Sequence, residues 1–156
     1  MLCETAEGYV HRLWDPLDAK RKPANEYAAK FSTPFNIAVA YVTGDAGLSA
    51  FSEKNVRDPR ILALAQKVRY VIDPNNPYPR QYTGHVRMTL RDGRVLEERQ
   101  PHIRGGVHDP LTREDIERKF LGNARYGGWP EARANGFLQR VPTFFDGKLD
   151  LGDLAT

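Results

Sequence analysis

The segment 30–35, Lys-Phe-Ser-Thr-Pro-Phe, combines residue types that bind anions with residue types that start a helix. Thr33 carries the hydroxyl of a helix N-cap and Pro34 suits the first helical turn, so we predict that a helix begins here. Its first N–H groups have no intrahelical partner, and the helix dipole adds positive charge. Because Lys30 and Ser32 stand just before this end, we predict that they bind a carboxylate or phosphate. The alternative is an ordinary capped core helix.

A second candidate is the irregular segment 101–110, in which Arg104 is followed by two glycines. A guanidinium beside backbone with little side-chain cover can hold a carboxylate through two parallel hydrogen bonds. The alternative is a tight turn that follows an arginine. His102 and His108 lie in the same loop, either as solvated side chains or as a general acid or base. We place Arg104 and His108 with the two residues of the first candidate in one predicted substrate-binding set.

The remaining chemistry-bearing residues exclude several classes of site. The four histidines are too far apart in sequence to form a helical metal pair, and no cysteine or acidic cluster completes a site, so we predict no metal and no cofactor. The single cysteine, Cys3, rules out an intramolecular disulfide and lacks a nearby basic residue that would activate it. We assign no catalytic residue.

The composition indicates a globular protein of modest size. The chain has 156 residues, of which 40% are hydrophobic, and its 23 Lys and Arg against 20 Asp and Glu give a net charge of +3. Basic and acidic residues are interleaved along most of the chain, which does not favour nucleic acid as a partner. No apolar run approaches the roughly 18 residues of a membrane span. The first residues do not resemble a signal peptide, so we predict no membrane association and a cytoplasmic location.

Helix signals recur along the chain. An apolar helix is predicted over 34–42, with Gly44 as a left-handed C-cap, and Asp58 caps the clearest amphipathic helix, over 58–68. Thr112 and Asp115 form a capping box, so a helix begins there and continues to about residue 124. That helix is expected to bury Ile116, Phe120 and Ala124. A further turn is predicted at 47–51, a helix at 130–139 and a weaker one near 149–154.

Strand signals are fewer and do not alternate with the helices one by one. We predict a strand or extended arm at 9–14, a strand at 69–72 and a hairpin that begins with the alternating segment 83–90. This pattern indicates an α+β fold with an antiparallel sheet, a hairpin and helices packed on one face. We expect residues 1–156 to form a single domain of this kind.

The register of the hairpin depends on its turn. If Gly93 takes the left-handed position of a three-residue loop, Met88 faces Leu96 and Arg87 faces Glu97. A two-residue loop would instead set Met88 against Glu97. The first register is chemically better, because it pairs apolar with apolar and basic with acidic residues.

A series of short motifs stands in a characteristic order along residues 10 to 125. They are Lys20-Arg21-Lys22-Pro23, Ala29-Lys30-Phe31-Ser32, the apolar helix ending in Gly44, Asp58-Pro59, Asp92-Gly93 in the hairpin, Arg104-Gly105, Pro110-Leu111 and Lys119-Phe120. Together they resemble the C-terminal region of the 2-methylcitrate dehydratase (MmgE/PrpD) family.

This resemblance implies a function. Family members act without a metal on small di- and tricarboxylates, as 2-methylcitrate dehydratases, cis-aconitate decarboxylases or iminodisuccinate epimerases. They are longer than this chain, and a large helical domain carries catalytic His and Lys residues, with the active site between it and the α+β portion. The chain resembles the α+β portion alone. We therefore expect a small di- or tricarboxylate ligand and, as protein partner, either a separate helical-domain subunit or a second copy of the chain.

One position departs from the family pattern. The tyrosine that is frequent in a Phe-Ser-x-x-Tyr motif is Phe35 here, and a phenyl ring cannot donate the hydrogen bond or proton that a phenol can. Two hypotheses follow. In the first, the chain is a component of a dehydratase-like lyase and is inactive alone. In the second, it is a stand-alone carboxylate-binding, structural or dimerisation module.

Overall fold

The computed structural model describes residues 1–144, 146–147 and 152. The chain forms two compact units, residues 1–110 and the part from residue 111 onward. A single domain over the whole chain stays a prediction. The weak helix predicted near 149–154 lies outside the described residues, apart from residue 152.

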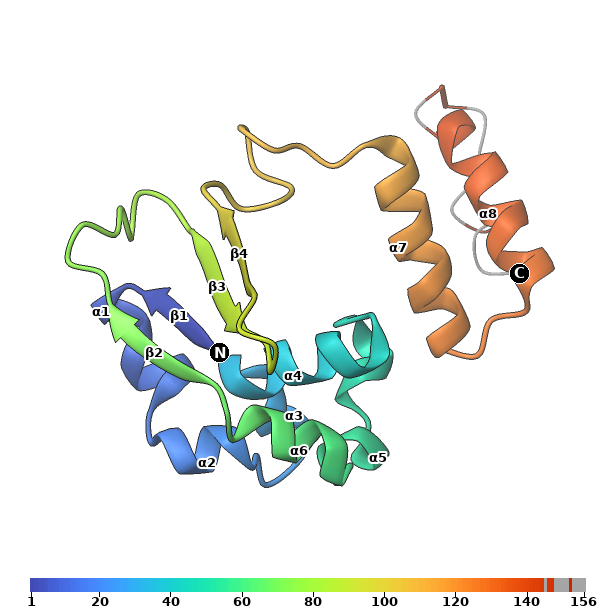
Figure 1. The fold of residues 1–156 in the computed structure, drawn as a ribbon. Helices are drawn as coiled ribbons and strands as arrows, with labels where there is room; N and C mark the ends of the chain where they lie inside the picture. Colours follow the sequence, from blue (N-terminus) through green and yellow to red (C-terminus); the bar gives the residue numbers. More distant parts are fainter. Residues whose placement is uncertain (145, 148–151, 153–156) are drawn as a thin grey trace. The chain divides into compact units, whose positions relative to one another are not determined.

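A four-stranded sheet organises the first unit, in the order β2-β1-β3-β4 (Figure 1). The predicted α+β class is confirmed, and the helices of this unit pack on one face of the sheet. The sheet is mixed rather than wholly antiparallel, because β1 pairs in parallel with β2 while the other pairs are antiparallel. The strands are β1 (Leu2–Thr5), β2 (Arg69–Ile72), β3 (Gly84–Thr89) and β4 (Val95–Gln100).

The prediction of an extended segment at 9–14 is wrong. This stretch is helical, and the strand precedes it as β1, whose four residues are too few for a clear period of two. The indole Nε1 of Trp14 donates a hydrogen bond to the Thr5 hydroxyl over 3.0 Å, which holds the helical segment against the strand. The segment consists of α1 (Glu7–Tyr9) and the π-helical turn η1 (Val10–Trp14).

The hairpin has the predicted three-residue register. Met88 pairs with Leu96 and Arg87 with Glu97, and Gly93 takes a φ of 86° at the turn. A positive φ of this size favours glycine, because a Cβ would clash with the backbone. The hairpin and its register are therefore confirmed.

The helix α4 (Thr33–Thr43) begins one residue earlier than its predicted cap implies. Its N-cap is Ser32, whose hydroxyl accepts the N–H of Phe35 at 3.1 Å, so the assignment of Thr33 as the cap is wrong. Ser32 is the cap because it keeps an extended backbone, which an N-cap requires. The helix ends as predicted at Gly44, which has a φ of 76°.

The other helices of this unit follow local signals. Asp58 caps its helix as predicted, through a 2.8 Å bond from the N–H of Arg60, and the turn expected at 47–51 is present. The helical elements are α2 (Leu17–Arg21), α3 (Glu26–Lys30), the 3-10 helix η2 (Leu48–Phe51), α5 (Glu53–Val56) and α6 (Pro59–Ala65).

Two hydrophobic clusters hold the unit together. The first lies between α3, α4, η2, α5 and α6 and is centred on Phe35, Val39 and Ile61, none of which is exposed. The second joins the sheet to the helices around Cys3, Trp14 and Val68, with Tyr70 and Val86 packed against it. Helices thus cover β1, β2 and the start of β3 on one face.

The second unit is a helical hairpin of α7 (Arg113–Tyr126) and α8 (Glu131–Phe144). The predicted capping box is present, since Thr112 and Asp115 exchange hydrogen bonds. Phe120 stacks on Phe137 with ring centroids 5.2 Å apart, and Ala124 is buried. The predicted burial of Ile116 is wrong, because this side chain is 55% exposed.

The cap of α4 gives a first testable prediction. Replacing Ser32 by Ala removes the acceptor of the Phe35 N–H and a donor to the Lys20 carbonyl in a buried place, so we expect a loss of about 1–3 kcal/mol in the free energy of unfolding. The Thr33→Ala variant is the matched control and should lose less than about 0.5 kcal/mol. Urea denaturation measures both. A larger loss in Thr33→Ala than in Ser32→Ala would contradict the assignment of Ser32 as the cap.

Candidate functional site

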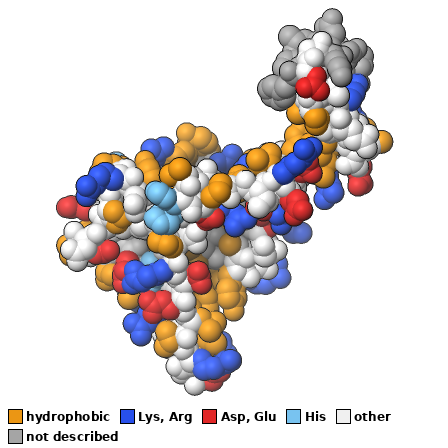
Figure 2. All heavy atoms as spheres, turned by 90° about the horizontal axis from the view of Figure 1, so that it is seen from above, with side chains coloured by type: hydrophobic (Ala, Val, Ile, Leu, Met, Phe, Trp, Pro, Cys, Tyr) orange, Lys and Arg blue, Asp and Glu red, His pale blue; other side chains and the backbone are white. Residues whose placement is uncertain are grey.

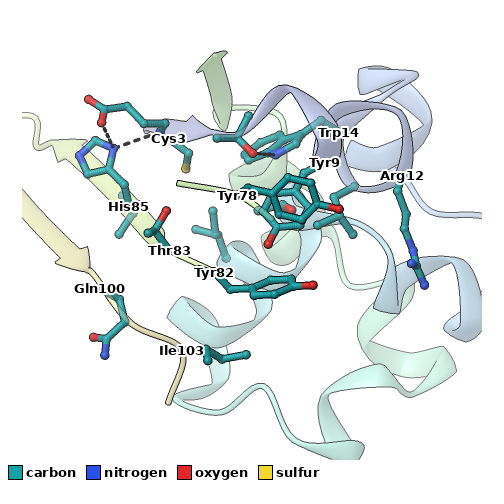
Figure 3. A pocket seen from close by; sticks show the side chains of 18 of the residues that line it. Cys3, Tyr9, Arg12, Trp14, Tyr78, Tyr82, Thr83, His85, Gln100 and Ile103 are labelled. Carbon is teal, nitrogen blue, oxygen red and sulfur yellow. Dashed lines mark hydrogen bonds and ion pairs between the residues drawn. The ribbon is translucent and has the colours of Figure 1, made fainter. Parts of the chain in front are cut away.

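One large pocket lies in the first unit, between the sheet and the helical segment that follows β1. Its volume is about 980 Å³. Parts of β1, α1, η1, the junction of α3 and α4, the loop 78–83, β3, β4 and the segment 102–104 form its wall. Figure 3 shows the side chains of Tyr9, Tyr78 and Tyr82 gathered in the centre of this region, with Arg12 to one side.

The structure brings two of the four predicted site residues together. Lys30 and Arg104 both line the pocket, although 74 residues of chain separate them. Ser32 does not line the wall and is fully buried behind it, so it cannot touch a ligand. His108 is also outside the wall, whereas His102 lies in it, with the two imidazole centroids 4.8 Å apart. Substrate binding by these residues stays a prediction.

The role of Ser32 is to position the site. Its hydroxyl donates a short hydrogen bond to the Lys20 carbonyl while it accepts the N–H of Phe35. The Lys20 ammonium in turn donates to the carbonyls of Arg12, at 2.5 Å, and Phe31, at 2.8 Å. Burial lowers the pKa of Lys20. These bonds tie η1 to the end of α3, so Arg12 and Lys30 share one wall of the pocket.

Arg12 is a site residue that the sequence reasoning missed. Its guanidinium lies over the ring of Phe31, 5.2 Å from the centroid, and the residue lines the pocket. Within the described residues neither Arg12 nor Lys30 forms an ion pair with a carboxylate. The only sequence signal was its spacing of three residues from Tyr9, which a helix would bring to one face.

Carboxylates also occur in the wall, at Glu4 and Glu98. Glu4 is engaged by Arg99, whose guanidinium lies 2.6 Å from its carboxylate, and this hydrogen bond lowers the pKa of Glu4. On the face of the molecule in Figure 2, basic and acidic side chains are interspersed. Arg12, Lys30 and Arg104 are the Lys and Arg residues that line the pocket.

His85 is a nearly buried wall residue with two defined partners. Its Nδ1 accepts the backbone N–H of Glu4 at 3.0 Å, and its Nε2 lies 2.9 Å from a carboxylate oxygen of Glu97. Since Nδ1 is an acceptor, the proton of the neutral ring sits on Nε2 and is donated to Glu97. The side chain is only 4% exposed. His85 therefore fastens β1 to the β-hairpin next to the pocket.

Phe35 does not line the pocket. Its ring is fully buried in the helical cluster, where its centroid lies 6.4 Å from that of Phe51. The phenols of the pocket come from other positions, Tyr9, Tyr78 and Tyr82. Burial raises the pKa of Tyr9 to about 12, with a smaller contribution from the two neighbouring tyrosines, so this phenol stays neutral at physiological pH.

Other classes of site have no counterpart in the part of the chain that the structure describes. There, no three His, Cys, Asp or Glu side chains gather closely enough to hold a metal ion. None of its helices combines the length and the apolar character that crossing a bilayer requires.

The fold and the pocket together define an α+β unit that presents cations and aromatic side chains at one cavity. The sequence profile of the MmgE/PrpD C-terminal domain matches residues 4–138. The chain belongs to this family.

Two relatives are similar over a shorter stretch. The cis-aconitate decarboxylase of Mus musculus is 29% identical over 104 residues, and that of Homo sapiens is 28% identical over 103 residues. Each match covers 65% of this chain and 21% of the relative. The chain thus spans about a fifth of the length of these relatives.

The two bonds of His85 give a second prediction. His85→Ala leaves the Glu4 N–H without its acceptor in a partly buried place, and we expect a loss of about 1–3 kcal/mol in the free energy of unfolding. The control is Arg87→Ala, because Arg87 lies two residues further along β3 and its side chain is more exposed than that of His85. This variant should lose less than about 1 kcal/mol. Thermal and urea unfolding measure both variants. Equal losses would contradict a specific role for His85.

The single thiol gives a third prediction. Burial raises the pKa of Cys3 from 9.0 to about 11, although the terminal ammonium acts in the opposite direction. Only the thiolate reacts with disulfide reagents, so we expect the folded protein to react far more slowly at pH 8 than the protein unfolded in urea. Absorbance of the released thiol dye follows the reaction. Equal rates in the folded and unfolded states would contradict the burial of Cys3.

Proposed function

We propose that this chain supplies the carboxylate-holding surface of a lyase that acts on small di- or tricarboxylates without a metal or other cofactor. The observation that carries this proposal is the presence of Arg12, Lys30 and Arg104 in the lining of one pocket. Guanidinium and ammonium groups are the side chains that bind carboxylates through charge-assisted hydrogen bonds. Membership in the MmgE/PrpD C-terminal domain family and the two decarboxylase relatives support the choice of ligand.

We assign to this pocket the binding of the acid and not its elimination. An elimination needs a base to take a proton and an acid to protonate the leaving group, each placed at the reacting carbon. His85 already accepts from the Glu4 N–H and lies against Glu97, while Glu4 is held by Arg99, which leaves His11, His102 and Glu98 as the other His and Glu residues that line the pocket. We propose that the proton-transferring groups come from a helical portion that is not within these 156 residues. That portion would belong either to a longer form of this polypeptide or to a separate subunit.

Calorimetric titration of the chain with 2-methylcitrate, cis-aconitate and citrate tests the binding step. We expect Lys30→Ala and Arg12→Ala each to weaken binding by about tenfold to a hundredfold, because each removes a charged hydrogen-bond donor. Lys22→Ala is the matched control, since Lys22 is an exposed lysine outside the pocket wall, and its affinity should be unchanged. The same affinity for Lys30→Ala, Arg12→Ala and the unaltered chain would contradict the proposed anion site.

Turnover distinguishes the lyase component from a non-catalytic carboxylate-binding, structural or dimerisation module. We expect the purified chain alone not to dehydrate 2-methylcitrate and not to decarboxylate cis-aconitate. The absorbance of the product measures both reactions. Co-expression with a helical-domain protein of the same family should restore activity, and Lys30→Ala should reduce it. A stable homodimer that binds no carboxylate would favour the second function.

A further inference from the structure

We propose that the pocket selects carboxylates that carry an aromatic ring, with the ring on the tyrosine cluster and the carboxylate on Arg12 and Lys30. This inference rests on the proposed carboxylate site and specifies its ligand further. The inference follows from the aromatic part of the cavity lining. A citrate-type acid is polar at every end and would leave this aromatic part without a matching contact.

The aromatic side consists of three tyrosines in mutual contact. The ring centroids of Tyr9 and Tyr78 are 4.4 Å apart, those of Tyr9 and Tyr82 are 5.9 Å apart, and Tyr78 meets Tyr82 edge-on at 5.6 Å and 90°. All three line the cavity, and Tyr82 remains 48% exposed (Figure 3). Aromatic rings attract further rings in stacked or edge-to-face arrangements, so the free surface of Tyr82 offers a place for one more ring.

The cluster is held in place before any ligand arrives. Within the loop that carries Tyr78 and Tyr82, the Asn76 side chain accepts from the N–H of Tyr78 at 3.1 Å and donates to the Thr83 hydroxyl at 3.0 Å. Tyr78 fits against α1 because residue 8 is a glycine: a Cβ there would lie 2.5 Å from the ring. A preformed surface loses little conformational entropy on binding.

Ring and charge belong to the lining of the same cavity. Tyr9 and Arg12 are three residues apart on the continuous segment formed by α1 and η1, and both line the cavity together with Tyr82 and Lys30. An acid that carries an aromatic ring can therefore meet both kinds of side chain in one cavity. The cavity volume of about 980 Å³ is at the upper end for sites that enclose ligands larger than citrate.

Titration of the full chain with three matched probes tests the proposal. The probes are butanedioate, 2-phenylbutanedioate and 2-hexylbutanedioate, which share two carboxylates and differ in the attached group. We expect the phenyl derivative to bind about tenfold more tightly than butanedioate and more tightly than the hexyl derivative, because the ring adds contacts with Tyr82. Calorimetry gives the three dissociation constants.

Variants identify the surface responsible. Tyr82→Ala should abolish the advantage of the phenyl probe while butanedioate binds as before, and Tyr82→Phe should keep the advantage. Gly8→Ala, which forces the Tyr78 ring to move, should reduce it independently. Tyr41→Ala is the control, because Tyr41 is a 61% exposed tyrosine outside the cavity, and it should change nothing.

The failures are distinguishable. Equal affinity for butanedioate and its phenyl derivative would overturn this inference and leave the carboxylate site intact. Binding of the hexyl probe as tight as that of the phenyl probe would overturn it in favour of a general apolar slot. No binding of any probe would overturn this inference, and no binding of 2-methylcitrate, cis-aconitate and citrate as well would also overturn the proposed function.

Discussion

The pocket depends on the hydrogen bonds that meet at Lys20 and Ser32. The Lys20 ammonium bonds the carbonyls of Arg12 and Phe31, and its own carbonyl accepts from Ser32, which also caps α4. Three short helical segments, η1, α2 and α3, are thereby fixed to the start of α4, the longest helix in the first unit. Lys20 therefore links these segments, because its ammonium donates hydrogen bonds to backbone oxygens and not to a ligand.

The same arrangement changes the meaning of the helix start as an anion site. In the sequence, Ser32 looked like a ligand hydroxyl, but burial assigns it to the cap. The cations that line the cavity do not come from the first turn of the helix: Lys30 precedes it, Arg12 lies on η1 and Arg104 follows β4. The positive end of the helix then contributes to the local field without direct contact, because Phe35 N–H is already bonded within the protein.

Sequence reasoning succeeded where the determinants are local and failed where they are distant. The Asp58 cap, the left-handed end at Gly44 and the hairpin register each depend on a few adjacent residues, and all were predicted. The helical conformation of residues 10–14 was not, because it depends on packing of Trp14 against a strand. The site residue Arg12 was missed for the same reason, since its place is set by Lys20 bonds that no periodicity encodes.

The edge strand β4 sets a condition on any assembly of this protein. All six of its residues are exposed, and Glu97 and Glu98 lie at its centre. Two such edges brought together antiparallel about their midpoint would face Glu97 with Glu98, and juxtaposed like charges oppose the joining of sheets. The negative charges at this edge therefore oppose the addition of further strands in a fibril. They also disfavour the symmetric association of two copies of β4 about that midpoint.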